Sequence, residues 1–330
     1  MVINKDSNAY TVIFATAMVV IVGGLLAFVS TSLKPLQEDN VRNEKKQLIL
    51  KAIGSEETKS ITREDAGKQF KKYVVERLIL DYEGNIIEGT RLTNETPVDI
   101  KSAKDAFAVD LKKEYKKFVQ PLTNKYTGSD LVDELTKEKN IHYPLFICEV
   151  NQRFMEELAL DGLKLKLIDI KEKLQEANEN NMDTSLSLAL SDTMFRIEEE
   201  LKGRKKHYVI PVMGKGLWAG VWGYIGLESD GRTISGAVFD HKSETPGLGA
   251  EISKDFFSDQ FIEKTIVDET GNYTPVKVVK PGTGVTQPYV DGISGGTFTS
   301  VGVDEMMNRT LSVYHKFFQN ESGKELLTKI

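Results

Sequence analysis

A segment near the C-terminus combines glycines with several hydroxyl side chains. Residues 291–300 read Asp-Gly-Ile-Ser-Gly-Gly-Thr-Phe-Thr-Ser. Apolar residues recur at helical spacing from 301 to 318, which predicts an amphipathic helix with Ser300 as its N-cap. Backbone N–H groups at a helix N-terminus, preceded by small residues, form a ready anion site. The same spacing also fits an ordinary glycine turn, so spacing alone does not reach a function.

A second glycine-rich loop lies upstream, at residues 244–251, with the sequence Glu-Thr-Pro-Gly-Leu-Gly-Ala-Glu. It follows two strands predicted at 221–227 and 234–239, which a turn at 229–231 connects. Such a loop lets the backbone approach a planar ligand, with Leu248 offering an apolar face. A rigid turn without a ligand fits the loop equally well.

Together, these residues resemble a known family. The pattern Asp-x-x-Ser-Gly-x-Thr at 291–297 resembles the flavinylation motif of the FMN-binding domain family, and residues 244–251 resemble its second signature. The resemblance implies that an exported flavin transferase joins FMN to Thr297 through a phosphoester bond. The family usually has alanine where this chain has Gly296, and glycine loosens the backbone before Thr297.

The resemblance also implies roles for other residues. Gly295, Gly296 and Thr299 would lie near the FMN phosphate, and Leu248 near the ring. Trp218 would stack on the ring or fill the core, whereas Glu244 would fix its loop and not act as a general base. No catalytic residue and no metal site are expected. The full set of expected FMN-binding residues is Thr297, Asp291, Ser294, Gly295, Gly296, Thr299, Glu244, Thr245, Gly247, Leu248, Gly249 and Trp218.

A further motif, Gly-Lys-Gly-Leu-Trp at 214–218, narrows the resemblance. With the two signatures, it is similar to the C subunits of sodium-translocating NADH:quinone reductases, strongly over 207–320 and weakly over 8–150. The G subunits of Rnf electron-transport complexes share the two signatures and are the nearest alternative. The resemblance implies an electron-carrier subunit of a six-subunit translocase that oxidises NADH, reduces ubiquinone and exports sodium.

This chain is not expected to oxidise NADH by itself. It has no Gly-x-Gly-x-x-Gly loop after a strand, as a dinucleotide site of the Rossmann type requires. Two other classes of protein stay open. A membrane-anchored module that binds a peptide or glycan without redox chemistry is disfavoured, because no aromatic cluster marks a groove. A stand-alone flavin reductase is disfavoured because no second substrate site is recognisable.

The N-terminal region contains an uncharged apolar run at residues 10–30, long enough to cross a bilayer as a helix. No small-residue cleavage site follows it, so we expect an uncleaved anchor in the bacterial inner membrane. One lysine precedes the run and four basic residues follow it closely. Because basic residues are enriched on the cytoplasmic side of a membrane span, this count alone would place the large domain in the cytoplasm. The resemblance implies the periplasmic side, and long domains translocate largely regardless of flanking charge.

The predicted fold class is α+β: a single transmembrane helix, then an FMN-binding domain of antiparallel strands with flanking helices. The expected divisions are a tail at 1–9, the span at 10–32, a helical connector at 33–60 and the extracytoplasmic domain at 61–330. A strand, turn and strand are predicted at 74–87, and a helix at 106–119. Strands at 143–150 and 207–212 are expected to be neighbours, interrupted by a helical insert at 151–203.

Composition sets outer limits on function. At 330 residues and 40% hydrophobic content, the chain can fill a sizeable core. Its formal charge of −6 gives no reason to expect a nucleic-acid partner. Cys148 is the only cysteine, so an internal disulfide is impossible, and its apolar neighbours predict a buried thiol. The four histidines show no metal-ligand spacing.

Overall fold

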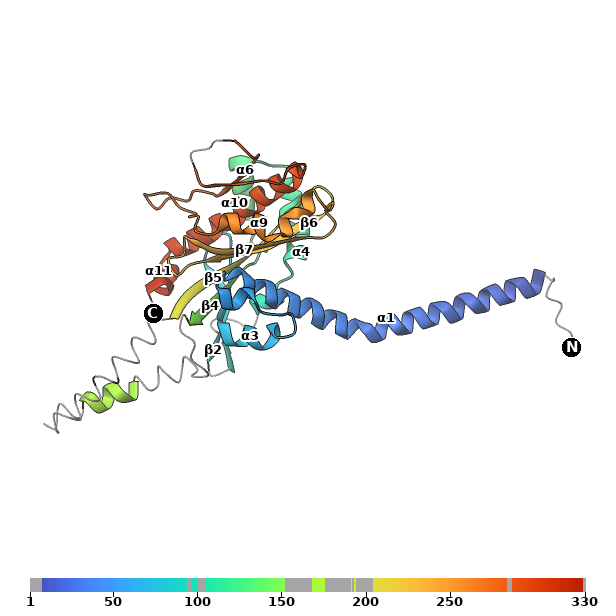
Figure 1. Cartoon of the computed structure of the whole chain (residues 1–330), viewed down its shortest axis with the longest axis horizontal. Coiled ribbons are helices and arrows are strands. Elements are labelled where there is room, and N and C mark those ends of the chain that lie inside the picture. Colours follow the sequence, from blue (N-terminus) through green and yellow to red (C-terminus); the bar gives the residue numbers. More distant parts are fainter. Residues whose placement is uncertain are drawn as a thin grey trace.

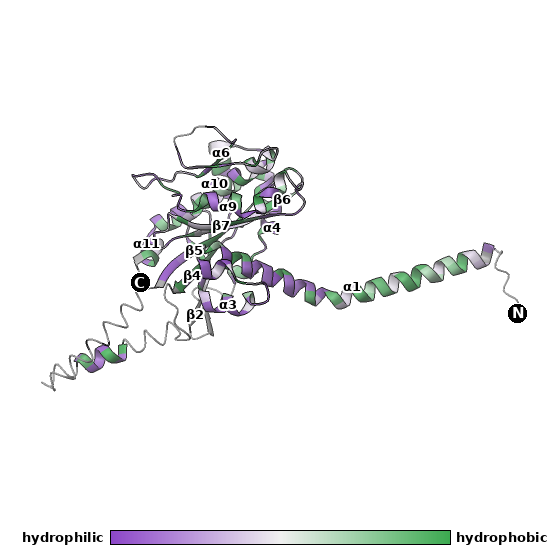
Figure 2. Ribbon diagram, viewed as in Figure 1, coloured by the Kyte–Doolittle hydropathy of each residue, from purple (hydrophilic) through white to green (hydrophobic). Residues whose placement is uncertain are grey.

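A long helix, α1 (Asn8–Ala52), projects from the folded domain (Figure 1). The computed structural model describes residues 8–93, 96–99, 105–151, 168–175, 191, 193, 204–283 and 287–328. The outer half of α1 is apolar and the half that reaches the domain is mixed in polarity (Figure 2). Its outer apolar side chains are exposed, and by length and composition it can span a membrane.

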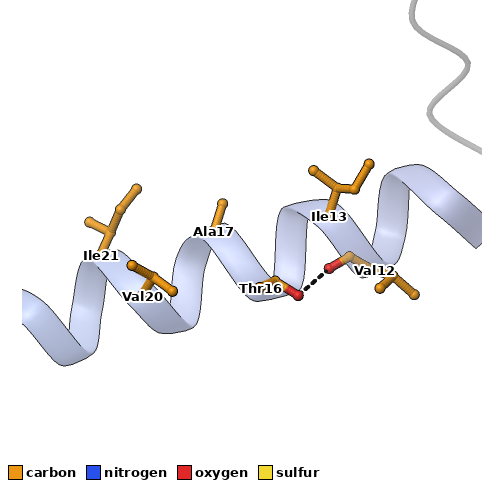
Figure 3. A pocket seen from close by; sticks show the side chains of 6 residues that line it. All are labelled: Val12, Ile13, Thr16, Ala17, Val20 and Ile21. Atoms are coloured by element: carbon orange, nitrogen blue, oxygen red, sulfur yellow. Dashed lines mark hydrogen bonds between the residues drawn. The ribbon is translucent and has the colours of Figure 1, made fainter.

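The outer half of α1 presents a shallow apolar surface. Val12, Ile13, Ala17, Val20 and Ile21 line it together with Thr16 (Figure 3). The Thr16 hydroxyl donates a hydrogen bond of 2.8 Å to the carbonyl of Val12, one turn earlier. Thr16 is the one polar residue that lines this surface, and its hydroxyl thus has a hydrogen-bond partner within the helix itself. Such internal bonding is what a polar group needs in a lipid environment.

The inner end of α1 is part of the domain's core. The helix bends near its middle and contains Pro35, which removes a backbone N–H and kinks helices. Ile49, Leu50 and Ala52 are fully buried. The connector predicted at 33–60 is thus a continuation of the spanning helix as far as Ala52, followed by the single turn α2 (Glu56–Lys59).

A seven-stranded antiparallel sheet forms the centre of the domain, in the order β3-β2-β1-β4-β5-β6-β7. Its predicted hairpins are confirmed, with turns around Gly84 and Gly231, both at positive φ. The pairing of the strands predicted at 143–150 and 207–212 is also confirmed. The strands are β1 (Val74–Leu80), β2 (Ile86–Thr93), β3 (Thr96–Asp99), β4 (Tyr143–Asn151), β5 (Arg204–Lys215), β6 (Gly220–Leu227) and β7 (Ile234–His241).

Helices cover both faces of this sheet, and side chains alternate between them as strand geometry dictates. In β4, Leu145 and Ile147 join the core beneath α10 (Thr297–Gln319), whereas Phe146 and Cys148 join the core beneath α1 and α3 (Ala66–Tyr73). Cys148 is fully buried, as expected, and burial raises its pKa well above the ordinary value. The thiol is therefore a packing group.

Smaller elements complete the fold. The single helix predicted at 106–119 is wrong, because Asp105 and Asp110 each cap a separate short segment by accepting a backbone N–H. The segments there are η1 (Ala106–Ala108), α4 (Leu111–Glu114), the π-helix η2 (Tyr115–Val119) and α5 (Gln120–Thr123). The others are α6 (Gly128–Lys137), η3 (Gly249–Ser253), α9 (Asp255–Ser258), η4 (Asp259–Phe261), the parallel pair β8 (Lys277–Val279) and β9 (Tyr289–Asp291), and α11 (Glu321–Thr328).

The helical insert predicted at 151–203 departs from the sheet between β4 and β5. The last described pair of these strands joins Asn151 to Arg204, so both ends of the insert lie side by side. Residues 168–175 are helical. The rest of the predicted insert lies outside the described residues, apart from Asn151, which ends β4, and helical residues 191 and 193.

Candidate functional site

Three segments far apart in the sequence meet beside β5 and β6. They are the loop at 216–219, the loop at 242–249 after β7, and the first turn of α10. Glu244 joins them: its carboxylate accepts hydrogen bonds from the backbone N–H of Trp218 at 3.0 Å and from the Thr299 hydroxyl at 2.6 Å. The three motifs singled out in the sequence therefore form one site.

The helix α10 begins four residues earlier than predicted, since its N-cap is Gly296 and not Ser300. Gly296 occupies the N-cap position and Thr297 is the first helical residue. Ser300 is not the N-cap, because its N–H already donates to the Gly296 carbonyl at 2.9 Å. Its hydroxyl instead accepts the N–H of Ile293 at 2.9 Å, which closes the preceding turn onto the helix.

Thr297 is exposed at the start of this helix. The backbone N–H groups of residues 297–299 precede the first intrahelical bond, from Ser300 to Gly296, so they form the kind of helix N-terminus that can bind an anion. Gly295 has a φ of +73°, a conformation that glycine adopts readily. A Cβ there would lie 2.6 Å from the Cδ2 of Leu248, so the two glycine-rich motifs pack directly against each other.

The loop at 244–249 is held by its own backbone. The N–H groups of Leu248 and Ala250 both donate to the Thr245 carbonyl, at 3.1 and 3.2 Å. Gly247 has a φ of +74° and donates its N–H to the Glu251 carboxylate at 3.0 Å. The loop presents the side chain of Leu248, which is 41% exposed. An apolar side chain held out of the core in this way can cover one face of a planar ligand.

Glu244 itself is buried, with 5% of its surface exposed. Burial acts to raise the pKa of its carboxyl, but hydrogen bonds from Thr299 and from the backbone of Trp218, Ala219 and Leu217 outweigh burial and leave the pKa below its ordinary value. The group is therefore a carboxylate at neutral pH. Because all its contacts are donors that hold loops together, the geometry agrees with a role in fixing loops.

Trp218 does not fill the core, since its side chain is 69% exposed. Leu217 and Phe298 are also largely exposed, at 48% and 70%, and the sequence reasoning missed both. A local signal could have indicated them, because each is a large apolar residue beside a motif residue: Leu217 precedes Trp218 in a loop, and Phe298 follows Thr297 in the first turn of α10. The site thus combines an exposed hydroxyl, helix N–H groups and several exposed apolar side chains.

The remaining predicted residues lie at the margin. Asp291 ends β9 with its side chain exposed, and Ser294 is exposed in the following turn. The side-chain amide of Gln260 makes two hydrogen bonds to the backbone of Asp291: it accepts the N–H at 2.8 Å and donates to the carbonyl at 3.3 Å. No pattern in the sequence indicated Gln260, because it lies 31 residues from its partner.

This donor set suits a phosphate ester of a flavin. A glycine cradle, a hydroxyl at a helix N-terminus and apolar side chains match a phosphate joined to a planar ring system. Within the described residues, no group of histidine, cysteine and carboxylate side chains is placed to hold a metal ion.

Comparison with known proteins agrees with this geometry. Residues 216–312 match the model of the FMN-binding domain family. A curated relative, the C subunit of the Na(+)-translocating NADH-quinone reductase of Vibrio vulnificus, is 43% identical over 97 residues, which are 29% of this chain and 37% of the relative. The matched part of the chain thus spans well under half of that relative's length.

Solved structures extend the likeness to most of the chain. The crystal structure of the C subunit of the Na(+)-translocating NADH-quinone reductase from Parabacteroides distasonis is 30% identical, with a TM-score of 0.54 over 88% of this chain and 98% of that one. The crystal structure of Shewanella oneidensis NqrC, 19% identical with a TM-score of 0.50, covers 87% of this chain and 98% of that one and supports the fold alone. The chain belongs to the family of Na(+)-translocating NADH-quinone reductase C subunits.

Proposed function

We propose that this chain is an electron-carrier subunit of a membrane complex that oxidises NADH, reduces ubiquinone and exports sodium. The carrier is FMN joined to the Thr297 hydroxyl through its phosphate by an exported flavin transferase. The single observation that carries the proposal is the position of Thr297: exposed, first in α10, and packed through Gly295 against the second FMN-family signature. The family match favours this assignment over a G subunit of an Rnf-type complex.

The residues of the site bind and orient the cofactor. The N–H groups at the start of α10 and the Gly295–Gly296 turn would hold the phosphate, together with Asp291, Ser294 and Thr299. Leu248 and Trp218 would hold the ring, and the loop of Thr245, Gly247 and Gly249 would let the backbone approach it. Bound FMN supplies reversible electron transfer. A covalent tether keeps the carrier at a constant place between its donor and its acceptor in the complex.

A redox experiment tests this function. The purified chain with attached FMN should leave NADH unoxidised, because the described residues contain no recognisable dinucleotide loop. In the assembled complex, rapid mixing with NADH should bleach the absorbance of this flavin before quinone is reduced. NADH oxidation by the isolated chain, or normal quinone reduction while this flavin stays oxidised, would contradict an electron-carrier role.

The proposed orientation puts the domain that follows the membrane span on the periplasmic side of the inner membrane. The charge count that opposes it includes Lys45, whose ammonium group donates to the Phe107 carbonyl at 2.5 Å and packs on the Phe107 ring, so this lysine is part of the folded domain. Alkaline phosphatase fused after Ile330 should be active, and a green fluorescent protein fused there should be dark. The reverse pair of signals would put the domain in the cytoplasm.

A further inference from the structure

The buried carboxylate of Glu244 lies between two segments that the proposed cofactor would contact. One oxygen, Oε1, accepts the N–H groups of Trp218 and Ala219 at 3.0 and 3.4 Å. The other, Oε2, accepts the Thr299 hydroxyl at 2.6 Å, from a residue 55 positions away in the sequence. Each oxygen thus holds a different segment, and the carboxylate bridges the two.

Two glycines leave room for this carboxylate, one beside each of its oxygens. A Cβ at Gly216 would lie 2.6 Å from Oε1, and a Cβ at Gly249 would lie 2.6 Å from Oε2. Such distances are shorter than van der Waals contact, so a side chain at either position would displace the carboxylate from the place where it accepts its hydrogen bonds. The loop bearing Glu244 is fixed in turn, since the Glu244 N–H donates to His241 Nδ1 at 3.2 Å.

Hydrogen bonds to an ionised acceptor are stronger than bonds between neutral groups, and they are strongest where water is excluded. Glu244 is 5% exposed, so the hydrogen bonds that its carboxylate accepts meet both conditions. Loss of the carboxylate would leave the backbone N–H groups of Trp218 and Ala219 and the buried Thr299 hydroxyl without this acceptor. The exposed side chain of Trp218 has little packing of its own to replace the lost restraint, since 69% of its surface is in solvent.

We propose that Glu244 is the positioning residue of this site: its carboxylate ties the Trp218 loop to the first turn of α10 and places a fixed negative charge between these two segments. The proposal rests on the proposed function for its redox consequence, whereas the tie between the two segments is a property of the chain without flavin. Two measurements therefore test separately the link between the two segments and the effect of the Glu244 charge on the flavin.

The first readout uses the full chain in detergent, produced without a flavin transferase. In Glu244→Ala, amide hydrogen exchange at Trp218 and Ala219 should be about tenfold or more faster than in the wild type, given the strength of bonds to a charged acceptor. Glu244→Gln keeps a carbonyl acceptor at nearly the same place and should restore most of the protection. Glu251→Ala is the matched control: Glu251 binds Gly247 inside the same loop, so exchange at Trp218 and Ala219 should not change.

The second readout is the midpoint potential of FMN attached to the same full-length chain. Glu244→Gln removes the negative charge and keeps the acceptor, so the potential should shift to more positive values, because an added electron meets less repulsion. If Glu244 served only to hold the fold, the midpoint potential would not change in Glu244→Gln, because the glutamine carbonyl still accepts the hydrogen bonds of the Trp218 loop.

Unchanged exchange in Glu244→Ala, or an unmoved potential in Glu244→Gln, would overturn the proposal. If Glu244→Ala does not fold, the potential of Glu244→Gln still decides. Absence of attached flavin from the wild type would contradict the proposed function, while the exchange experiment would still test the tie.

Discussion

Replacing Thr297 with valine should remove the attached flavin completely while leaving the fold intact. Valine is nearly isosteric with threonine and lacks only the hydroxyl that would carry the phosphoester. Thr297 is exposed, so the change leaves no buried polar group without a partner. The measurement is in-gel fluorescence of the denatured protein after coexpression with a flavin transferase. The expected signal falls to background, and quinone reduction by the complex should fail with it.

The neighbouring hydroxyls should not substitute for Thr297. Thr299 is 1% exposed and donates to Glu244, and Ser300 is 6% exposed and accepts the N–H of Ile293. Neither hydroxyl is accessible to a transferase. Thr297→Ser keeps an exposed hydroxyl and should retain the fluorescent band, which makes it the control. A band that persists in Thr297→Val, carried by Thr299 or Ser300, would show that the acceptor has been assigned wrongly.

The second large effect is expected at Gly302, where α10 packs directly on the sheet. A Cβ at this position would lie 2.0 Å from the carbonyl oxygen of Lys215, which is backbone and cannot yield like a flexible side chain. Gly302→Ala should therefore push α10 away from β5 and lower the free energy of unfolding by about 3 kcal/mol or more. Thermal unfolding of the full chain in detergent measures the loss, and flavin attachment should fall as well, because α10 carries Thr297.

The control for Gly302 is the same substitution in another helix. Gly67 lies in α3, and a Cβ there would meet only the ends of the Asn43 and Lys46 side chains, at 3.6 and 3.8 Å. Gly67→Ala should stabilise the protein slightly, by up to about 1 kcal/mol, because alanine favours a helix. Equal effects of the two substitutions, in either direction, would contradict the close packing of α10 on β5.

Local sequence patterns predicted much of the sheet. Gly84 and Gly231 lie in turns whose geometry favours glycine, so the hairpins around them could be recognised from a few residues. The pairing of β4 with β5 across the insert was also predicted, from two apolar stretches on either side of a helical segment. Hydrophobic alternation and turn chemistry are short-range signals, and for that reason they can be read without knowing the fold.

The hydrogen bonds that side chains make to the backbone and to each other could not be predicted. The start of α10 was misplaced because Ser300 bonds backward to Ile293 and does not cap the helix. The helix expected at 106–119 is broken because Asp105 and Asp110 cap separate segments. The tie between Glu244 and Thr299 and the clip from Gln260 to Asp291 depend on pairs that only the tertiary fold brings together.

The motifs of the site could be recognised from the sequence alone, because each one lies within a short stretch of residues. How the motifs are arranged relative to one another could not. Thr297 and Leu248 belong to separate glycine-rich stretches, and only the packing of Gly295 on Leu248 shows that they form one surface. Which apolar side chains are exposed at the site also depends on the fold. Trp218 could have filled the core as readily as the site from its sequence alone, and its exposure decides against the core.

The bond between FMN and Thr297 is tested most directly by the mass of the peptide that contains residues 291–300. The full chain is coexpressed with a flavin transferase, purified, digested and analysed by tandem mass spectrometry. We expect this peptide to be heavier by one FMN less one water, with fragment ions that place the added mass on Thr297. An unmodified peptide from a fluorescent protein, or the added mass on any other residue, would contradict the assignment.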